Sequence, residues 1–325
     1  MDHLRLHSDD AGARLDRVLA RRLGLSRRAV WQLLDEGRVQ LNGRTVSQRD
    51  KGRMLAGDDV LAVTPFVAPD ARRAIANPQL PLAVMAVDEA AGGWLIADKP
   101  AGMPVHPLRP GETQTLLNAI IARHPAIHGV GEAGLRSGVV HRLDVDTSGL
   151  VLFALTQPLW HRLRQAFTDH AIAKQYLALV QGHPPAVGRE TMHLAVTQHR
   201  PARVRVVEPH HHQSRPCSLA WQVRERFAGT ALVEVELHTG FLHQIRAMFA
   251  HLGHPVVGDR VYSQTSPVRN EPSRPPVPRL MLHAHRLALD AHLHAESPPP
   301  PDFQQVLQRT RTASHGRSQD PRDRA

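Results

Sequence analysis

Apolar residues near the N-terminus recur at spacings that predict two short helices. Between Arg14 and Gly24 they repeat every three to four positions, which predicts a helix that ends at Gly24. Ser26 is the expected cap of a second helix, and Gly37 follows the end of that helix. The two patterns together predict a pair of helices at the start of the chain.

A strand pattern follows the second helix. Residues 39–41 and 44–46 flank the dipeptide Asn42-Gly43, which tight hairpin turns favour. Residues 60–63 form a further short apolar run after a turn. We therefore predict a small α/β unit that spans residues 1–64.

The remaining chain divides into three parts. Residues 65–81 are rich in Pro, Ala and Arg without a period, which predicts a linker. Residues 82–309 alternate strand and helix patterns and form the predicted large domain, in which the loop 266–278 is expected to be mobile. Residues 310–325 are rich in Arg, Ser, Asp and Pro, and we expect a disordered basic tail there.

Composition and charge narrow the class of protein. The chain has 325 residues with 42% hydrophobic residues and 22% charged residues, which is a globular composition. Its net charge of +10 favours an anionic partner such as nucleic acid. The single cysteine, Cys217, excludes an intramolecular disulfide framework. The sequence has neither a membrane-length apolar run nor a secretory signal, so we expect a cytoplasmic protein.

Arginines gather on the predicted N-terminal helices and before the hairpin. Those of the first helix lie three and four residues apart, so they share one face. Such a stripe is either an RNA-contacting surface or an ordinary solvated face, and the residues alone leave both readings open. The set is Arg14, Arg17, Arg21, Arg27, Arg28 and Arg38.

Residues 138–155 contain the most distinctive polar stretch of the large domain. Two apolar runs flank Asp144 and Asp146, an arrangement typical of a catalytic loop mounted between strands and also of a capped surface loop. The two aspartates could form a metal pair, but no further ligand lies at metal-binding spacing in this stretch.

Three further segments place polar side chains beside a strand or a helix. Lys174 and Tyr176 share one face of a predicted strand. Arg246 shares a helix face with His243, and its residue context alone favours a surface charge. The segments are residues 94–107, 174–182 and 237–259.

Taken together, these segments resemble the RluA-type pseudouridine synthases in order and spacing. His-Arg-Leu-Asp at 141–144 followed by Thr-Ser-Gly-Leu at 147–150 is similar to the signature of that family. Asp-Lys-Pro-Ala-Gly at 98–102 and His-Gln-Ile-Arg at 243–246 resemble two other family motifs. The sequence departs at Phe241, where the family commonly has arginine.

The resemblance implies an α+β catalytic fold with a mixed, mainly antiparallel sheet and flanking helices. It implies that Asp144 is the catalytic carboxylate, that Arg246 pairs with it, and that Tyr176 stacks on the target base and takes part in proton transfer. It implies a structural role near the site for residues 98–102. The substrate-binding residues that it implies are His141, Arg142, Thr147, Lys174, Gly240, His243 and Gln244.

The N-terminal unit resembles the S-four-like RNA-binding module, which implies that its arginines grip RNA. Synthases that carry this module commonly act on large-subunit ribosomal RNA, so that RNA is the expected target, with transfer RNA as the alternative. The isomerisation involves no redox change and no net hydrolysis, so we expect no cofactor and no metal. A monomer is the default expectation.

Two other classes of function stay open at this point. The first is a non-catalytic RNA-binding or ribosome-assembly factor that has kept the fold, which the presence of Asp144, Tyr176 and Arg246 disfavours. The second is a metal-dependent hydrolase, suggested by 23 histidines and the run at 210–212. Neighbouring histidines in a polar loop more often bind metal adventitiously than catalytically.

Overall fold

The fold is described from a computed structural model. It covers residues 2–4, 10–25, 27–66, 73–88, 93–132, 134–199, 201–263 and 277–317. The expected helix cap Ser26 and most of the loop predicted to be mobile, 266–276, lie outside the described residues. So do the side chain of Arg28 and the final residues 318–325.

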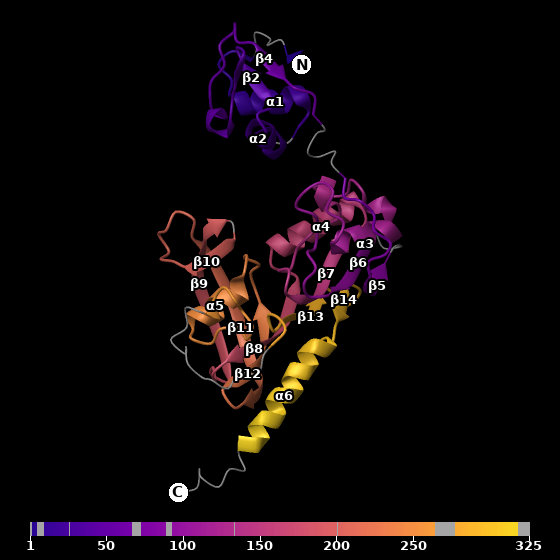
Figure 1. Ribbon diagram of the computed structural model, residues 1–325, viewed down its shortest axis with the longest axis vertical. Helices are drawn as coiled ribbons and strands as arrows, with labels where there is room; N and C mark the ends of the chain where they lie inside the picture. The colour runs from indigo at the N-terminus through magenta and orange to yellow at the C-terminus, as the bar shows by residue number, and fades with distance from the viewer. Residues whose placement is uncertain are drawn as a thin grey trace.

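The N-terminal unit has the predicted pair of helices and a four-stranded sheet with the strand order β1-β4-β2-β3 (Figure 1). Asn42 and Gly43 have φ angles of 51° and 75°, the left-handed conformation that a tight hairpin turn of the primed type requires. One apolar cluster joins both helices to the sheet. The elements are β1 (Asp2–Leu4), α1 (Leu15–Leu23), α2 (Arg27–Asp35), β2 (Val39–Leu41), β3 (Arg44–Thr45) and β4 (Leu61–Val63).

A ten-stranded sheet forms the large domain, with the strand order β10-β9-β11-β12-β8-β13-β7-β6-β5 and β14 beside β13. Strands β13 and β7 pair in parallel and the other pairs are antiparallel, so the predicted mixed, mainly antiparallel sheet is confirmed. Its strands are β5 (Ala83–Asp88), β6 (Trp94–Lys99), β7 (Ser148–Ala154), β8 (Ala173–Gln181), β9 (Val187–His199), β10 (Ala202–Val206), β11 (Arg215–Phe227), β12 (Thr230–Leu237), β13 (Leu282–Ala288) and β14 (His294–Glu296).

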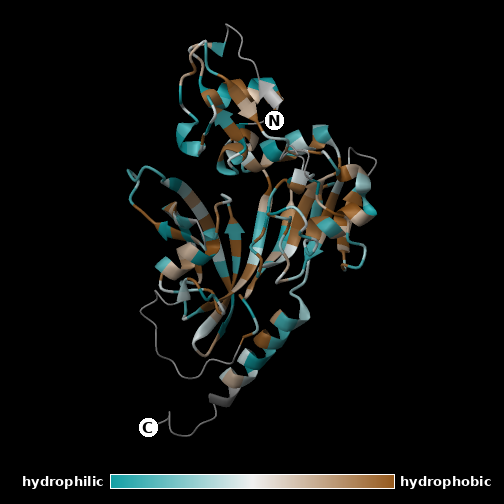
Figure 2. Ribbon diagram, turned by 45° about the horizontal axis from the view of Figure 1, so that its top comes forward, coloured by the Kyte–Doolittle hydropathy of each residue, from teal (hydrophilic) through white to brown (hydrophobic). Residues whose placement is uncertain are grey.

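Helices flank this sheet at both ends (Figure 1). Helices α3 (Leu116–Arg123) and α4 (Gln157–Thr168) lie beside β6 and β7, and α5 (Gln244–His251) lies near β10. Hydrophobic residues concentrate in the strands of both sheets, whereas loop tips are hydrophilic (Figure 2). Strand β8 lies near the middle of the large sheet, so its side chains are far from both edges of the sheet.

The C-terminal segment differs from the prediction. Helix α6 (Pro301–Arg317) continues through the residues expected to begin a disordered tail at 310. Its apolar residues Phe303, Val306 and Leu307 pack against Leu177 and Leu179 of the sheet. Composition alone missed this helix because its stability comes from tertiary packing of a narrow apolar stripe.

The predicted linker is also shorter than expected. Ala74 is buried in the core of the large domain. The backbone N–H of Asn77 donates to the carbonyl oxygen of Asn118, and the Asn77 side chain donates to that of Thr113. The second half of segment 65–81 therefore packs on the large domain, because its side chains find specific backbone partners there.

Candidate active site

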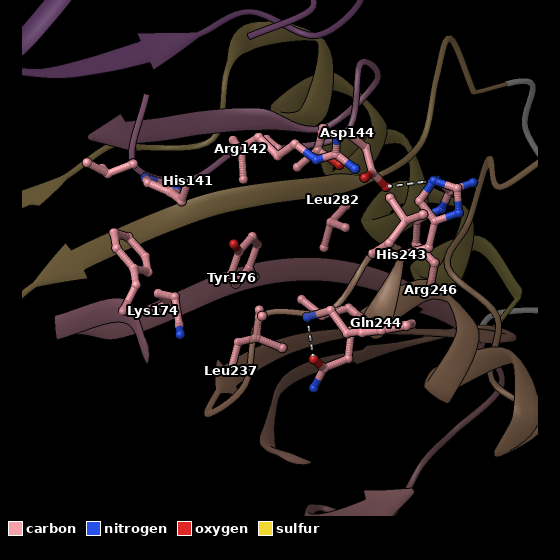
Figure 3. A pocket seen from close by; sticks show the side chains of 18 of the residues that line it. His141, Arg142, Asp144, Lys174, Tyr176, Leu237, His243, Gln244, Arg246 and Leu282 are labelled. Atoms are coloured by element: carbon pink, nitrogen blue, oxygen red, sulfur yellow. Dashed lines mark hydrogen bonds and ion pairs between the residues drawn. The ribbon is translucent and has the colours of Figure 1, made fainter. Parts of the chain in front are cut away.

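One cavity of about 420 Å³ unites the residues that the sequence nominated in the large domain (Figure 3). Its walls come from the loop before β7, from β8, from α4 and from the turn that leads into α5. The nominated residues that line it are His141, Arg142, Asp144, Thr147, Lys174, Tyr176, Gly240, His243, Gln244 and Arg246. Residues that are more than 100 positions apart in sequence thus share one site.

Arg246 is held between two carboxylates. Its Nη1 atom lies 2.8 Å from Oδ2 of Asp144. On the other side, its Nε and Nη2 atoms donate to the two carboxylate oxygens of Asp259 at 2.7 and 3.1 Å. Burial opposes the charged form of Arg246, but the hydrogen bond and the charge of Asp259, with the charge of Asp144, raise its pKa above the ordinary value. A permanently charged arginine therefore faces Asp144.

Asp259 is a supporting residue to which the sequence analysis gave no role. Its side chain is fully buried, and Oδ1 also accepts hydrogen bonds from the backbone N–H groups of Val261 and Tyr262. These contacts fix the carboxylate, which in turn fixes the guanidinium of Arg246. The sequence signal for this residue is the Gly-Asp pair that ends segment 237–259. The spacing of that pair does not indicate that its aspartate contacts Arg246.

A buried lysine clamps the loop that carries Asp144. The Nζ atom of Lys99 donates to the backbone carbonyl oxygens of Pro100, Met103 and Val145 at 2.8 to 2.9 Å. Burial lowers the pKa of Lys99 to about 7, although the charges of Asp144 and Asp146 oppose this shift. The structural role expected for residues 98–102 thus takes the form of a contact to the residue next to Asp144.

His243 stands close to the same carboxylate. Its Nε2 atom lies 3.8 Å from Oδ2 of Asp144, and its Nδ1 atom lies 2.9 Å from the hydroxyl of Tyr262. Its φ angle of 52° is in the left-handed region, which few non-glycine residues adopt outside specially supported positions. Burial lowers the pKa of His243, although Asp144 opposes the shift, so the imidazole is neutral at pH 7.

Tyr176 provides an aromatic wall beside Asp144 (Figure 3). It lies on β8, and 8% of its surface is exposed. Burial and then the charge of Asp144 raise the pKa of its phenol far above 10, so the hydroxyl stays protonated. The site therefore combines one carboxylate, a fixed guanidinium and a flat neutral ring, which suits a planar base held beside that carboxylate.

Comparisons with known proteins agree with this geometry. The family model described as RNA pseudouridylate synthase matches residues 93–251, and the S4 domain model matches residues 13–51. An uncharacterized RNA pseudouridine synthase of Synechocystis is 33% identical to the chain, covering 91% of the chain and 88% of the relative. The chain belongs to the RNA pseudouridylate synthase family.

Other relatives of this pseudouridine synthase bear more specific names. Ribosomal large subunit pseudouridine synthase D of Escherichia coli is 34% identical, over 77% of the chain and 73% of the relative. The structure of human RNA pseudouridylate synthase domain containing 4 matches with a TM-score of 0.55 at 22% identity, covering 70% of the chain and 93% of the human chain. The structural match shows the shared catalytic fold, and the sequence matches show the enzyme class, an isomerase.

Two of the nominated residues have their polar atoms committed within the synthase. The Gln244 amide accepts from Thr239 and from the Phe241 backbone N–H, and it donates to the Ser218 carbonyl. His141 accepts a hydrogen bond from the Leu152 backbone N–H at its Nε2 atom. Gln244 therefore shapes the turn that forms the pocket wall, and His141 ties the loop that carries Asp144 to β7.

His141 gives the synthase an acid-sensitive stability. Burial lowers its pKa to about 3, so it stays neutral in the folded state while the unfolded chain takes up a proton below about pH 6.5. The free energy of unfolding should therefore fall as the pH drops from about 6.5 to about 3, by up to about 1.4 kcal/mol per pH unit from this residue. We expect His141→Gln, whose amide oxygen can accept from Leu152, to flatten this slope in urea unfolding measured across that range. An equal slope in the variant would contradict the assignment.

Buried carboxylates hold several of the predicted RNA-binding arginines in the S4 domain. Arg14 donates to both carboxylate oxygens of Asp16 at 3.0 Å, and Arg27 lies 3.3 Å from the same carboxylate. Arg21 forms an ion pair with one carboxylate oxygen of the buried Asp10. The guanidinium groups remain partly exposed, so these pairs position them at the surface rather than bury them.

The other predicted arginines are placed differently. Arg17 is exposed on α1, and Arg38 contacts Glu36 and the Pro65 carbonyl oxygen. The side chain of Arg28 lies outside the described residues. Lys51, which the sequence analysis did not nominate, lies 4.4 Å above the ring of Trp31, so the same domain also presents an aromatic ring next to its cations.

The histidine run at 210–212 lies in the turn between β10 and β11. Within the described ranges, no group of three or more His, Cys, Asp or Glu side chains is arranged to hold a metal ion. In the same part of the chain, no helix has both the length and the apolar character needed to cross a membrane.

Proposed function

We propose that this synthase converts specific uridines of large-subunit ribosomal RNA to pseudouridine, with Asp144 as the catalytic carboxylate. The contact of 2.8 Å between Arg246 and Asp144 carries the assignment of Asp144, because it joins two residues that line the same cavity. Several relatives at 32–36% identity, which are named ribosomal large subunit pseudouridine synthase D, support the choice of RNA. The S4 domain and the net charge of +10 also favour a large, folded RNA.

The reaction needs one ionised carboxylate. The bond from the ribose C1′ to N1 of uracil breaks, the base turns, and a bond from C1′ to C5 forms. C5 loses a proton and N1 gains one, so the composition of the nucleotide is unchanged. A carboxylate next to the anomeric carbon supports cleavage of such a bond as nucleophile, base or electrostatic stabiliser. The guanidinium of Arg246 lies 2.8 Å from the Asp144 carboxylate in a partly closed site and forms an ion pair with it.

The residues that line the pocket stack on and contact the extruded uridine. Removing a base from a folded RNA costs a few kcal/mol, which stacking and backbone contacts offset. Tyr176 provides the stacking surface. Arg142 is exposed at the rim, where its guanidinium can replace the lost contacts of the extruded base. Phe241, at the position where the family commonly has arginine, and Leu242 line the cavity with apolar surface.

The proposal predicts activity on ribosomal RNA in a purified system. The full-length protein, incubated without added metal and in the presence of a chelator, should form pseudouridine in unmodified large-subunit ribosomal RNA. Transfer RNA, tested in parallel, should remain unmodified. Modification of transfer RNA alone would overturn the choice of substrate, and dependence on a metal would contradict the proposed chemistry.

The S4 domain should determine affinity and selectivity. Its apolar core is separate from the cores of the catalytic domain, so deletion of residues 1–64 should leave a folded catalytic domain. We expect the truncated protein to bind large-subunit RNA about tenfold to a hundredfold more weakly, with a shallower salt dependence, because phosphate contacts are lost. Filter binding at several salt concentrations checks this. Unchanged affinity and salt dependence would show that the domain has another role.

A further inference from the structure

Lysine is rare in this chain, and all three lysines have specific environments. Of the 40 Lys and Arg residues only Lys51, Lys99 and Lys174 are lysines. Lys51 lies on the ring of Trp31, and Lys99 donates to three carbonyl oxygens. An ammonium group is a compact charge with three donors, whereas guanidinium is planar and larger. Lysine at position 174 therefore indicates a place where a compact cation is needed.

Lys174 is buried in the catalytic cavity without an acceptor. Only 6% of its surface is exposed, and it lines the same cavity as Asp144. Within the described part of the chain, its Nζ atom makes neither a hydrogen bond nor an ion pair, and it lies over the face of the Phe167 ring, 5.8 Å from the centroid. Burial lowers its pKa, with no carboxylate to offset the shift. A buried ammonium without an acceptor is unfavourable, so a ligand that supplies one is expected.

The surroundings of Lys174 contain donors and positive charge. The Nε2 atom of His141 accepts from a backbone N–H, so the proton of its neutral ring is on Nδ1 and makes that atom a donor. Arg164 and His170 line the same cavity, and the charges of Lys174 and Arg164 both act on His141. Among the described lining residues Asp144 is the one carboxylate, and it lies at the opposite end (Figure 3). This end of the cavity thus suits an anion.

The distance along β8 identifies which part of an RNA could reach Lys174. Lys174 and Tyr176 are two residues apart on one strand face, which separates their Cα atoms by about 7 Å. A uracil stacked on Tyr176 therefore leaves Lys174 beside the adjoining backbone. The anionic group of that backbone is the phosphodiester.

We propose that Lys174 binds the phosphodiester group adjacent to the target uridine, and that this contact fixes the uridine against Tyr176 and Asp144. The inference rests on the proposed function, since it requires an RNA uridine in this cavity. It assigns a ligand group to the end of the cavity that lies away from the reacting bond. The phosphate is on either the 5′ or the 3′ side of the uridine, and the experiments below distinguish the two.

The kinetic test combines a protein variant with a modified RNA. Lys174→Met keeps the length of the side chain but removes the charge, so the rate of single-turnover pseudouridine formation should fall about 10- to 100-fold. The slope of log affinity against log salt concentration should become shallower by about 1, as expected for the loss of one phosphate contact. An RNA with an uncharged methylphosphonate at the contacted linkage should show the same loss with the wild type. Combining the two changes should cause no further loss. The inference would be overturned if the rate losses from Lys174→Met and from the methylphosphonate multiply, whether the methylphosphonate is on the 5′ or the 3′ side of the uridine.

Urea unfolding of the Lys174→Met variant distinguishes a phosphate-binding role of Lys174 from a structural role. Because Lys174 has no acceptor, Lys174→Met should unfold at the same or a higher urea concentration than the wild type. Arg311→Gln, which removes a cation from an exposed ion pair with Glu225, is the matched control and should retain wild-type activity. A clear loss of stability in Lys174→Met would indicate a structural lysine. If the wild type forms pseudouridine and Lys174→Met is equally active, this inference fails and the proposed function stands.

A measurement on the unchanged protein gives a second test. Protein labelled at the lysine Cε atoms should give three signals, one for each lysine. In a titration to saturation of the pocket, uridine 5′-monophosphate or uridine 3′-monophosphate should shift the signal of Lys174 and raise its apparent pKa, whereas uridine should not. The nucleotide that acts identifies the side of the contacted phosphate. An equal shift with uridine, or no shift with either nucleotide, would overturn the proposal.

Discussion

Replacing Asp144 with Asn should reduce pseudouridine formation to below about one-thousandth of the wild-type rate, because the change removes the charge on which the reaction depends. The substitution keeps the size of the side chain, and 22% of the Asp144 side chain is exposed, so the fold should persist. RNA binding should also persist, since the S4 domain and the cationic side chains of the cavity are unaffected. Single-turnover assays and binding measurements on the same RNA check both expectations.

Asp146 offers a matched control two residues away. It is exposed in the same loop and does not line the cavity. Asp146→Asn makes the same chemical change and should leave the rate within a few fold of the wild type. Equal losses in both variants would show that the loop, rather than the Asp144 carboxylate, is what the reaction requires.

Replacing Asp259 with Asn should have the largest effect on stability. Asp259 is fully buried and forms a two-point contact with Arg246, so the change leaves a buried guanidinium with one of its two partners. Removing one partner of a buried ion pair typically costs about 3–5 kcal/mol. We expect a decrease in the free energy of unfolding of this size, together with a loss of activity, because Arg246 is no longer held against Asp144.

The exposed pair of Arg311 and Glu225 provides the comparison for stability. Glu225→Gln removes one carboxylate at the surface and should change the free energy of unfolding by less than about 1 kcal/mol. Urea unfolding of both variants measures the difference. An Asp259→Asn protein as stable and as active as the wild type would contradict the role of this pair.

The sequence predicted the elements whose signals are local. Asn42 and Gly43 specify their turn by backbone preference, and the short apolar run at 60–63 appears as strand β4. Helix α6 was missed because Phe303, Val306 and Leu307 acquire their partners only in the folded sheet. The second half of the predicted linker was missed for the same reason, since Asn77 finds its acceptor on a distant segment.

In the site too, local motifs predict some residues, whereas the contacts between distant segments arise only on folding. The family motifs nominated Asp144, Tyr176 and Arg246, and these residues line one cavity. The second carboxylate on Arg246, that of Asp259, and the contact of Lys99 with the carbonyl oxygen of Val145 are products of chain folding. Periodicity reports which face a residue occupies, and it does not report which distant residue meets that face.

The most direct test of the account is a map of pseudouridines across total RNA from cells that carry either the wild-type protein or Asp144→Asn. We expect one or more uridines of large-subunit ribosomal RNA to lose the modification in the variant, while Asp144→Asn still binds that RNA. A ribosomal RNA map that is the same in both cells would contradict the account.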